Sequence, residues 1–193
     1  MMRHDRIRDL EAELMREAGC RDVKTEPHLI PLANPNNING NVADNARLDV
    51  AGVGVWGPME RTFLDIRVTH PNCPTHKDKD IQQVYETQEV EKKKAYNERI
   101  IEVEKGSFTP IVVSTFGGMG QEAEKFHKRL ATLISIKRNE TYSSVVNYIR
   151  TRLRFSLLKS VLTSIRGVRG KRMNEGIAPI ASLSFNLINF DEH

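Results

Sequence analysis

The run FTPIVVSTF, at residues 108–116, constrains the fold more than any other stretch. Its centre is continuously apolar, which is typical of a strand that is buried on both faces. Segments with helical character lie on either side of it, at about 81–103 and at 121–138. A buried strand between two helices predicts a sheet that is covered by helices on both faces.

The remaining periodic segments complete an α/β pattern. We expect helices at 5–18 and 141–167, and strands at 22–30, 46–56 and 62–70, of which the last two form a hairpin. Gly167 and Gly170 are expected to end the last helix. The order helix, three strands, helix, strand and two helices predicts one domain over 1–172 with a mixed central sheet. The tail at 173–193 is expected to be disordered or to form a small strand.

Composition narrows the class of protein. No apolar run among the 193 residues approaches a membrane span, and the charged N-terminus lacks the apolar centre of a secretory signal. Cys20 and Cys73 have no metal-ligand spacing, so we expect reduced thiols in an intracellular protein. The net charge is +4, and the charged residues are unevenly distributed along the chain. Residues 137–175 contain ten Lys and Arg but only two acidic residues. This local excess indicates a polyanionic partner, or simply a solvated helix face.

Two expected strands each carry an aspartate among apolar residues. Asp49 lies in ARLDV and Asp65 in RTFLDIRVTH. A carboxylate within a strand costs free energy unless it is paired, protonated or bound to a metal. The predicted hairpin can bring both to one end of the sheet, where paired carboxylates suit Mg²⁺ or Mn²⁺ and hence phosphodiester hydrolysis.

Such a site also needs a cation beside the attacking water or the phosphate. The residue two positions after Asp65 is Arg67, which we expect to contact a phosphate but which is a poor base because it does not deprotonate. Lys92 and Tyr96 are four residues apart and share a helix face, and if that face looks at the end of the sheet, Lys92 can supply the ammonium. The structural alternative is a surface ion pair of Asp65 with Arg67 and a solvated lysine run.

Several stretches resemble one known family. ARLDV, FLDIRVTHPN, EKKKAYNERIIEVEKGSFTPIVVSTFGGMGQEA and FSLLKSVLTSIRG are similar to the region that follows the reverse transcriptase in animal LINE-like retroelements. That region is a restriction-endonuclease-like domain of the PD-(D/E)XK superfamily, and the resemblance covers about residues 4–170. It implies a mixed central sheet flanked by helices, and a DNA endonuclease that depends on Mg²⁺ or Mn²⁺.

The resemblance also implies roles for individual residues. Asp49 and Asp65 match the two metal-binding acids, and Lys92 and Tyr96 match a displaced catalytic lysine and its tyrosine. Glu26 is the best match to a further metal-binding glutamate, with Glu11 and Glu17 as other candidates. Arg67 replaces the lysine of the core motif, so activity depends on Lys92. The chain is then an endonuclease of retroelement origin or its degenerate descendant.

The basic helix at 141–167 is amphipathic, and its exit adds further cations. The residues that we expect to contact DNA phosphates, together with Arg67, are Arg150, Arg154, Arg169 and Lys171. The other partners considered are a second copy of the chain and the reverse transcriptase of the same element, and the expected location is the nucleus. Two other functions stay open, namely a non-catalytic nucleic-acid-binding module of the same fold and a scaffold whose basic helix docks a protein.

Overall fold

The computed structural model describes residues 2–31, 46–76 and 79–173, with side chains placed over 4–31, 46–76 and 79–163. The elements are α1 (Met2–Glu17), β1 (Arg21–Thr25), β2 (Val50–Val53), β3 (Arg61–Thr69), α2 (Ile81–Arg99), the π-helical turn η2 (Ile100–Glu104), β4 (Ser107–Ser114), α3 (Gln121–Arg138) and α4 (Tyr142–Met173). This order confirms the predicted succession of helices and strands. The division into a domain at 1–172 and a tail stays a prediction, since 174–193 lie outside the described residues.

The four strands form one mixed sheet in the order β1-β2-β3-β4. β1 pairs with β2 and β2 with β3 in antiparallel orientation, and Val50 lies opposite Leu64 in the predicted hairpin. β3 and β4 run parallel over eight pairs, in which Asp65 lies opposite Pro110. The apolar run at 108–116 therefore contains the strand β4, which is buried in the sheet as its composition predicts.

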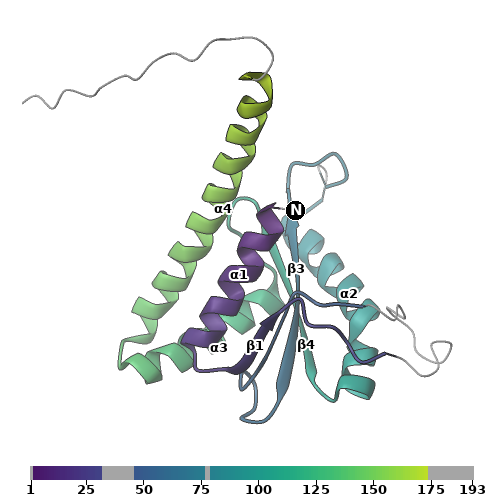
Figure 1. The fold of residues 1–193 in the computed structure, drawn as a ribbon, viewed down its shortest axis with the longest axis vertical. Helices are drawn as coiled ribbons and strands as arrows, with labels where there is room; N and C mark the ends of the chain where they lie inside the picture. The colour runs from purple at the N-terminus through teal and green to yellow at the C-terminus, as the bar shows by residue number, and fades with distance from the viewer. Residues whose placement is uncertain (1, 32–45, 77–78, 174–193) are drawn as a thin grey trace, which may run out of the picture.

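Helices cover both faces of this sheet (Figure 1). The main apolar core joins α1, α3 and α4 to one face, where Leu64 and Ile66 of β3 are buried. A second cluster lies on the other face, where Phe63 packs with Ile100 and Tyr96 from the segment of α2 and η2. Because side chains alternate along a strand, Asp65 shares the face of Phe63 and points toward α2.

Two predicted strands are shorter in the structure than in the sequence pattern. β1 ends at Thr25 because Glu26 adopts a left-handed backbone conformation with φ of 51°. The predicted strand at 46–56 is regular only over Val50–Val53. The chain before it pairs instead with the segment after β1, through the bonds Leu29 N to Ala46 O and Leu48 N to Pro27 O.

The last helix corrects one prediction. α4 continues through Gly167 and Gly170 and ends at Met173. A glycine in a helix interior costs about 1 kcal/mol relative to alanine, which weakens a helix without ending it. The first half of α4 packs against α1, and its C-terminal part extends past the rest of the described chain (Figure 1). None of the helices in the described ranges is long and apolar enough to cross a membrane.

Candidate metal and phosphate site

The site lies where β2 separates from β3. Asp49 immediately precedes β2, and its backbone N–H still donates to Leu64 O. The next ladder partner of β3 is missing, because residues 46–48 have turned toward the segment after β1. The carboxylate of Asp49 replaces that partner, since its Oδ2 accepts the backbone N–H of Ile66 at 2.5 Å. The side chain of Asp49 is therefore fixed beside Asp65, the residue that precedes Ile66.

Asp65 is paired with the predicted lysine from the facing helix. The Nζ of Lys92, on α2, lies 2.5 Å from Asp65 Oδ2. Asp65 is only 8 % exposed, so this ammonium compensates a carboxylate that is otherwise shielded from water. The predicted alternative, an ion pair of Asp65 with Arg67, does not form.

The charges around Asp65 act on its pKa in opposite directions. Burial raises the pKa of the Asp65 carboxyl, and the nearby charge of Asp49 adds to this effect. Lys92 opposes the increase through its charge and its hydrogen bond, but the pKa stays above the ordinary value of an aspartate. A buried carboxylate near a second carboxylate is a configuration that an additional cation would stabilise.

His4 is a member of the site that the sequence analysis did not identify. Its Nε2 lies 3.0 Å from Asp49 Oδ2, and this hydrogen bond raises the pKa of the imidazole. His4 lies on the helix face of Ile7 and Glu11, both buried, which is the signal that could have indicated it. Its partner is 45 residues away, so no local motif connects the two.

Tyr96 lies next to Lys92, as the shared helix face predicts. The Lys92 Nζ is 5.9 Å from the centre of the Tyr96 ring, within the range of a cation–π contact. The same ring packs on Phe108 of β4, with the ring centres 5.6 Å apart. Tyr96 thereby connects Lys92 to the sheet and limits the positions that its ammonium can take.

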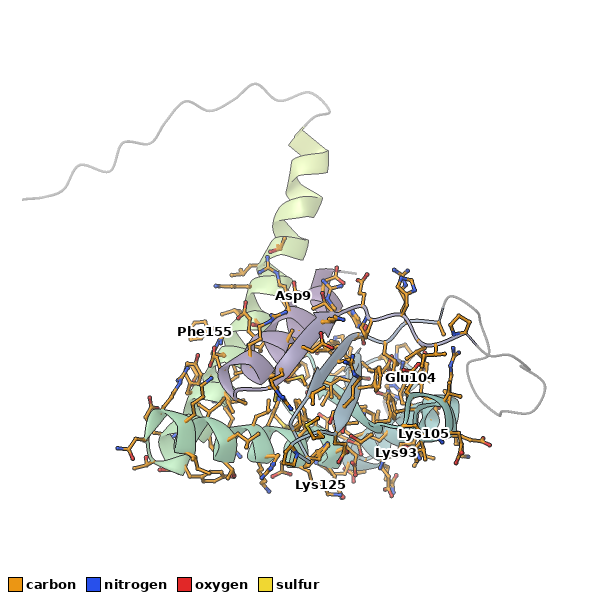
Figure 2. All side chains as sticks on the ribbon, turned by 60° about the horizontal axis from the view of Figure 1, so that its bottom comes forward. Asp9, Lys93, Glu104, Lys105, Lys125 and Phe155 are labelled. Carbon is orange, nitrogen blue, oxygen red and sulfur yellow. The ribbon has the colours of Figure 1, made fainter. Side chains whose placement is uncertain are left out.

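Neighbouring cations are engaged elsewhere. Arg67 donates to Glu91 at 2.8 Å, and its side chain is exposed to solvent. Lys93, which follows Lys92, pairs with Glu122 at 3.3 Å, and Lys125 pairs with the same carboxylate at 3.0 Å. Figure 2 shows Lys93 and Lys125 on the same side of the molecule. Lys92 is thus distinguished from Lys93 by its partner.

The side chain of Glu26 is bound by arginines. Its side chain pairs with Arg8 and, at 3.5 Å, with Arg47, although its backbone N–H donates to Asp49 O. Within the ranges that the structure describes, no group of three or more His, Cys, Asp and Glu side chains is arranged to hold a metal ion. Asp49 and Asp65 are the two carboxylates that the structure brings together, so they are the residues that would hold a divalent cation, and hard oxygen ligands of this kind suit Mg²⁺ or Mn²⁺.

The other glutamates proposed from the resemblance have structural partners. Glu11 is fully buried and bonded to His127 Nε2, with distances of 2.9 and 3.0 Å to its two oxygens. Glu17 binds three side chains that connect α1 to the end of α3 and the start of α4, namely Arg138, Tyr148 and Arg152.

The cations of α4 divide into two groups. Arg152 is bound by Glu13 and Glu17, so it holds α4 against α1. Among the placed side chains, Arg150, Arg154 and Lys159 make no ion pair or hydrogen bond and are available to a polyanion. Arg169 and Lys171 belong to α4, but the structure does not describe their side chains.

The glycine-rich turn after β4 is closed by a carboxylate. Glu89 of α2 accepts the backbone N–H of Glu122 at 3.0 Å, at the start of α3. A Cβ at Gly120 would lie 2.1 Å from Glu89 Oε1, and Gly117 has φ of +87°. These glycines therefore allow a tight strand-to-helix turn, and Glu89 occupies the helix start where a phosphate would otherwise bind.

Comparison with known proteins adds no assignment, because no protein-family model and no curated protein matches the chain.

Proposed function

We propose that the chain is a divalent-metal-dependent DNA endonuclease of retroelement origin, with the restriction-endonuclease-like form of the mixed α/β fold and a place of action in the nucleus. The observation that carries this proposal is the pairing of Lys92 with a buried strand carboxylate, Asp65, beside a second fixed carboxylate, Asp49. Two acids that can hold a metal ion and a lysine that can stabilise charge are groups suited to phosphodiester hydrolysis.

The residues would divide the work as follows. Asp49 and Asp65 would hold Mg²⁺ or Mn²⁺, which when bound supplies Lewis-acid activation of the phosphate and lowers the pKa of a bound water. Lys92 would move from Asp65 to orient the attacking water or to neutralise charge on the phosphate. Tyr96, through its contact with Lys92, would limit the positions of the ammonium. Arg150 and Arg154 would hold the backbone of the DNA.

The first test is nicking of supercoiled plasmid by the purified chain with Mg²⁺, Mn²⁺ or EDTA. We expect cleavage with either metal and none with EDTA. Asp65→Ala should abolish cleavage and leave salt-sensitive DNA binding unchanged, because the carboxylate serves the metal and not the phosphate backbone. Cleavage by Asp65→Ala at the wild-type rate would exclude this assignment.

A second candidate is a nucleic-acid-binding module of the same fold that has lost catalysis. The observation that favours it is Arg67, which stands in the place of the motif lysine and is bound to Glu91. In that case the wild-type chain binds DNA through its α4 cations and shows no cleavage at any metal concentration. The same plasmid assay, combined with a binding assay in EDTA, separates the two candidates.

A further inference from the structure

A continuous groove runs along α4, between this helix, α3 and the turn at 115–120. It consists of three adjoining hollows of about 170, 230 and 160 Å³. The first and second share Met119, Glu124 and Arg150, and the second and third share Gly117 and Arg154. The groove is thus a feature of one face of α4 and is separate from the pairing of Asp65 with Lys92.

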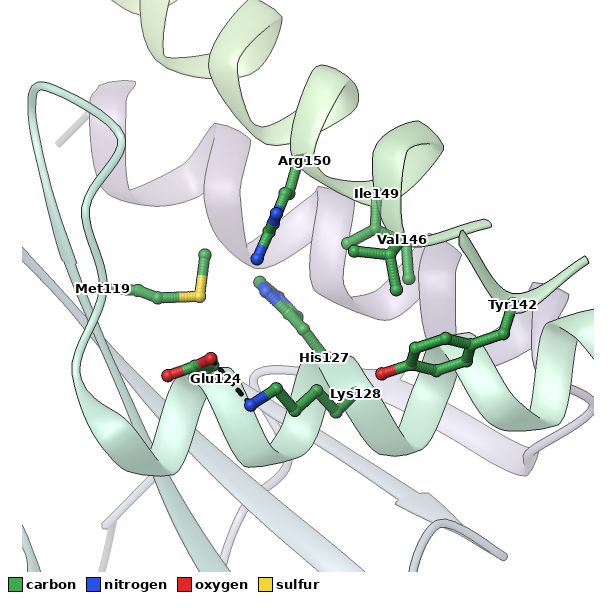
Figure 3. A pocket seen from close by; sticks show the side chains of 8 residues that line it. All are labelled: Met119, Glu124, His127, Lys128, Tyr142, Val146, Ile149 and Arg150. Atoms are coloured by element: carbon green, nitrogen blue, oxygen red, sulfur yellow. Dashed lines mark ion pairs between the residues drawn. The ribbon is translucent and has the colours of Figure 1, made fainter. Parts of the chain in front are cut away.

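Half of the residues that line the first hollow are apolar or aromatic, and the other half, namely Glu124, His127, Lys128 and Arg150, carry polar groups. Figure 3 shows Arg150 pointing from α4 and His127 from α3 toward each other, with Met119, Val146 and Ile149 around them. An apolar cavity of about 150 Å³ holds a benzene ring, so this hollow has the size for one aromatic ring.

The polar groups of the hollow have unused hydrogen-bonding capacity. His127 is 6 % exposed, and its Nε2 is bonded to Glu11. Its Nδ1 is buried and has no hydrogen-bond partner in the described part of the chain. Arg150 makes no ion pair there either, whereas the two other charged groups of the hollow, Glu124 and Lys128, pair with each other at 2.8 Å.

The positive charge of the groove favours a ligand that carries regularly spaced anionic groups. The charged side chains that line the three hollows are Lys128, Arg150, Arg154 and Glu124, which give a surplus of positive charge. Arg150 and Arg154 are four residues apart and therefore point from the same face of α4, with Cβ atoms about 6 Å apart. A row of arginines beside a ring-sized apolar hollow matches a nucleic acid strand, which offers successive phosphates and unstacked bases.

We propose that this groove binds unpaired nucleotides of a DNA strand, with one base in the hollow between His127 and Ile149 and the adjoining phosphates on Arg150 and Arg154. The inference rests on the proposed function and specifies its substrate as DNA that contains an unpaired or extruded nucleotide. Thr115, at one end of the groove, bonds to Thr69, which lies four residues after Asp65 on β3. At roughly 3.3 Å per residue, the Thr115 end of the groove lies about 13 Å along β3 from Asp65, whose side chain points to the α2 face of the sheet.

The test is fluorescence anisotropy in EDTA, where no cleavage occurs, with a labelled duplex and with the same duplex carrying one unpaired thymidine. We expect the wild-type chain to bind the second DNA about tenfold more tightly, as for one base transferred to a protein surface. Val146→Phe fills the hollow and should remove this preference. Arg150→Gln should weaken binding of both DNAs and reduce the preference, whereas Lys159→Gln, on α4 but outside the groove, should weaken both equally.

Two results of these binding measurements would contradict the proposal. Equal affinity of the wild-type chain for both DNAs, or an unchanged preference in both Val146→Phe and Arg150→Gln, would overturn it. The groove would instead belong to a peptide if an acidic, apolar peptide, and neither DNA, bound in a Val146-dependent way. Because binding is measured without metal, loss of the base preference and absence of plasmid cleavage are separate results, and each refutes only its own proposal.

Discussion

The carboxylate of Asp49 accepts the backbone N–H of Ile66, at the point where β2 leaves β3. One side chain thus has two functions, since it completes the hydrogen bonding of a strand and presents a charge beside Asp65. The pairing of Asp65 with Lys92 and the hydrogen bond of Asp49 to the Ile66 N–H explain why aspartates are tolerated at these positions. An apolar residue at position 49 would leave the Ile66 N–H without this acceptor.

These two functions of Asp49 can be separated by substitution. Asp49→Asn keeps an oxygen that can accept the Ile66 N–H but lowers the affinity for a divalent cation. We expect it to lose metal-dependent cleavage and to unfold at nearly the wild-type urea concentration. Asp49→Ala should lose cleavage as well and also lose about 1–3 kcal/mol of stability, the cost of a buried N–H without a partner. Equal stability of the two variants in urea titrations would contradict the structural function.

Lys92 and Lys93 provide a matched comparison, because they are adjacent on α2 and each has a carboxylate partner. Lys92→Met removes the ammonium beside Asp65 and should reduce the rate of plasmid nicking by about 10²- to 10³-fold, as for other groups that stabilise transition-state charge. Lys93→Met loses only an exposed pair with Glu122 and should nick within about twofold of the wild-type rate. Similar rates for the two variants would remove Lys92 from the mechanism.

The sequence predicted the element order because apolar periodicity reports burial directly. It also predicted that Asp49 and Asp65 lie close together, because a hairpin is a local pattern, whereas Lys92 was matched to this site through the resemblance and not through a local pattern. It missed His4, and it could not show that Glu26 is held by arginines, since each contact joins residues far apart in the chain. The end of α4 was misplaced because glycine only lowers helix propensity.

The contacts of the arginines on α4 also could not be predicted in full from the sequence. The sequence selected Arg150 and Arg154 as phosphate contacts but gave no partner for Arg152, and the structure supplies that partner. Arg152 faces the acids of α1, and Arg150 and Arg154 face the groove. Helical spacing shows that Arg150 and Arg154 share a face that Arg152 does not, but which element each face meets depends on the packing of α4 against α1.

Glu89 should make stability depend on pH. Burial raises the pKa of its carboxyl in the folded chain, so the folded state binds this proton more tightly than the unfolded state does. The contribution to stability is therefore complete below the unfolded pKa, about 4.3, and is lost as the pH rises through the higher folded pKa. Glu89→Gln keeps an acceptor for the Glu122 N–H and removes the titration.

The measurement is a series of urea titrations between acid and neutral pH. The stability of Glu89→Gln relative to the wild-type chain should increase with pH across this window and then become constant. Glu86→Gln, an exposed change on the same helix, should show no such trend. A relative stability of Glu89→Gln that falls as the pH rises would show that the folded carboxyl has a lowered pKa instead.

Glu11 and Glu13 give the sharpest test of how α1 is held. Glu11 is fully buried and bonded to His127, whereas the side chain of Glu13 is 54 % exposed and pairs with Arg152. Glu11→Ala leaves a buried imidazole without its partner and opens a gap in the core, so we expect a loss of about 3–5 kcal/mol. Glu13→Ala should cost at most about 1 kcal/mol, as for other surface ion pairs. If urea titrations gave equal losses for the two variants, the pair of Glu11 and His127 would not be the contact that fixes α1 on α3.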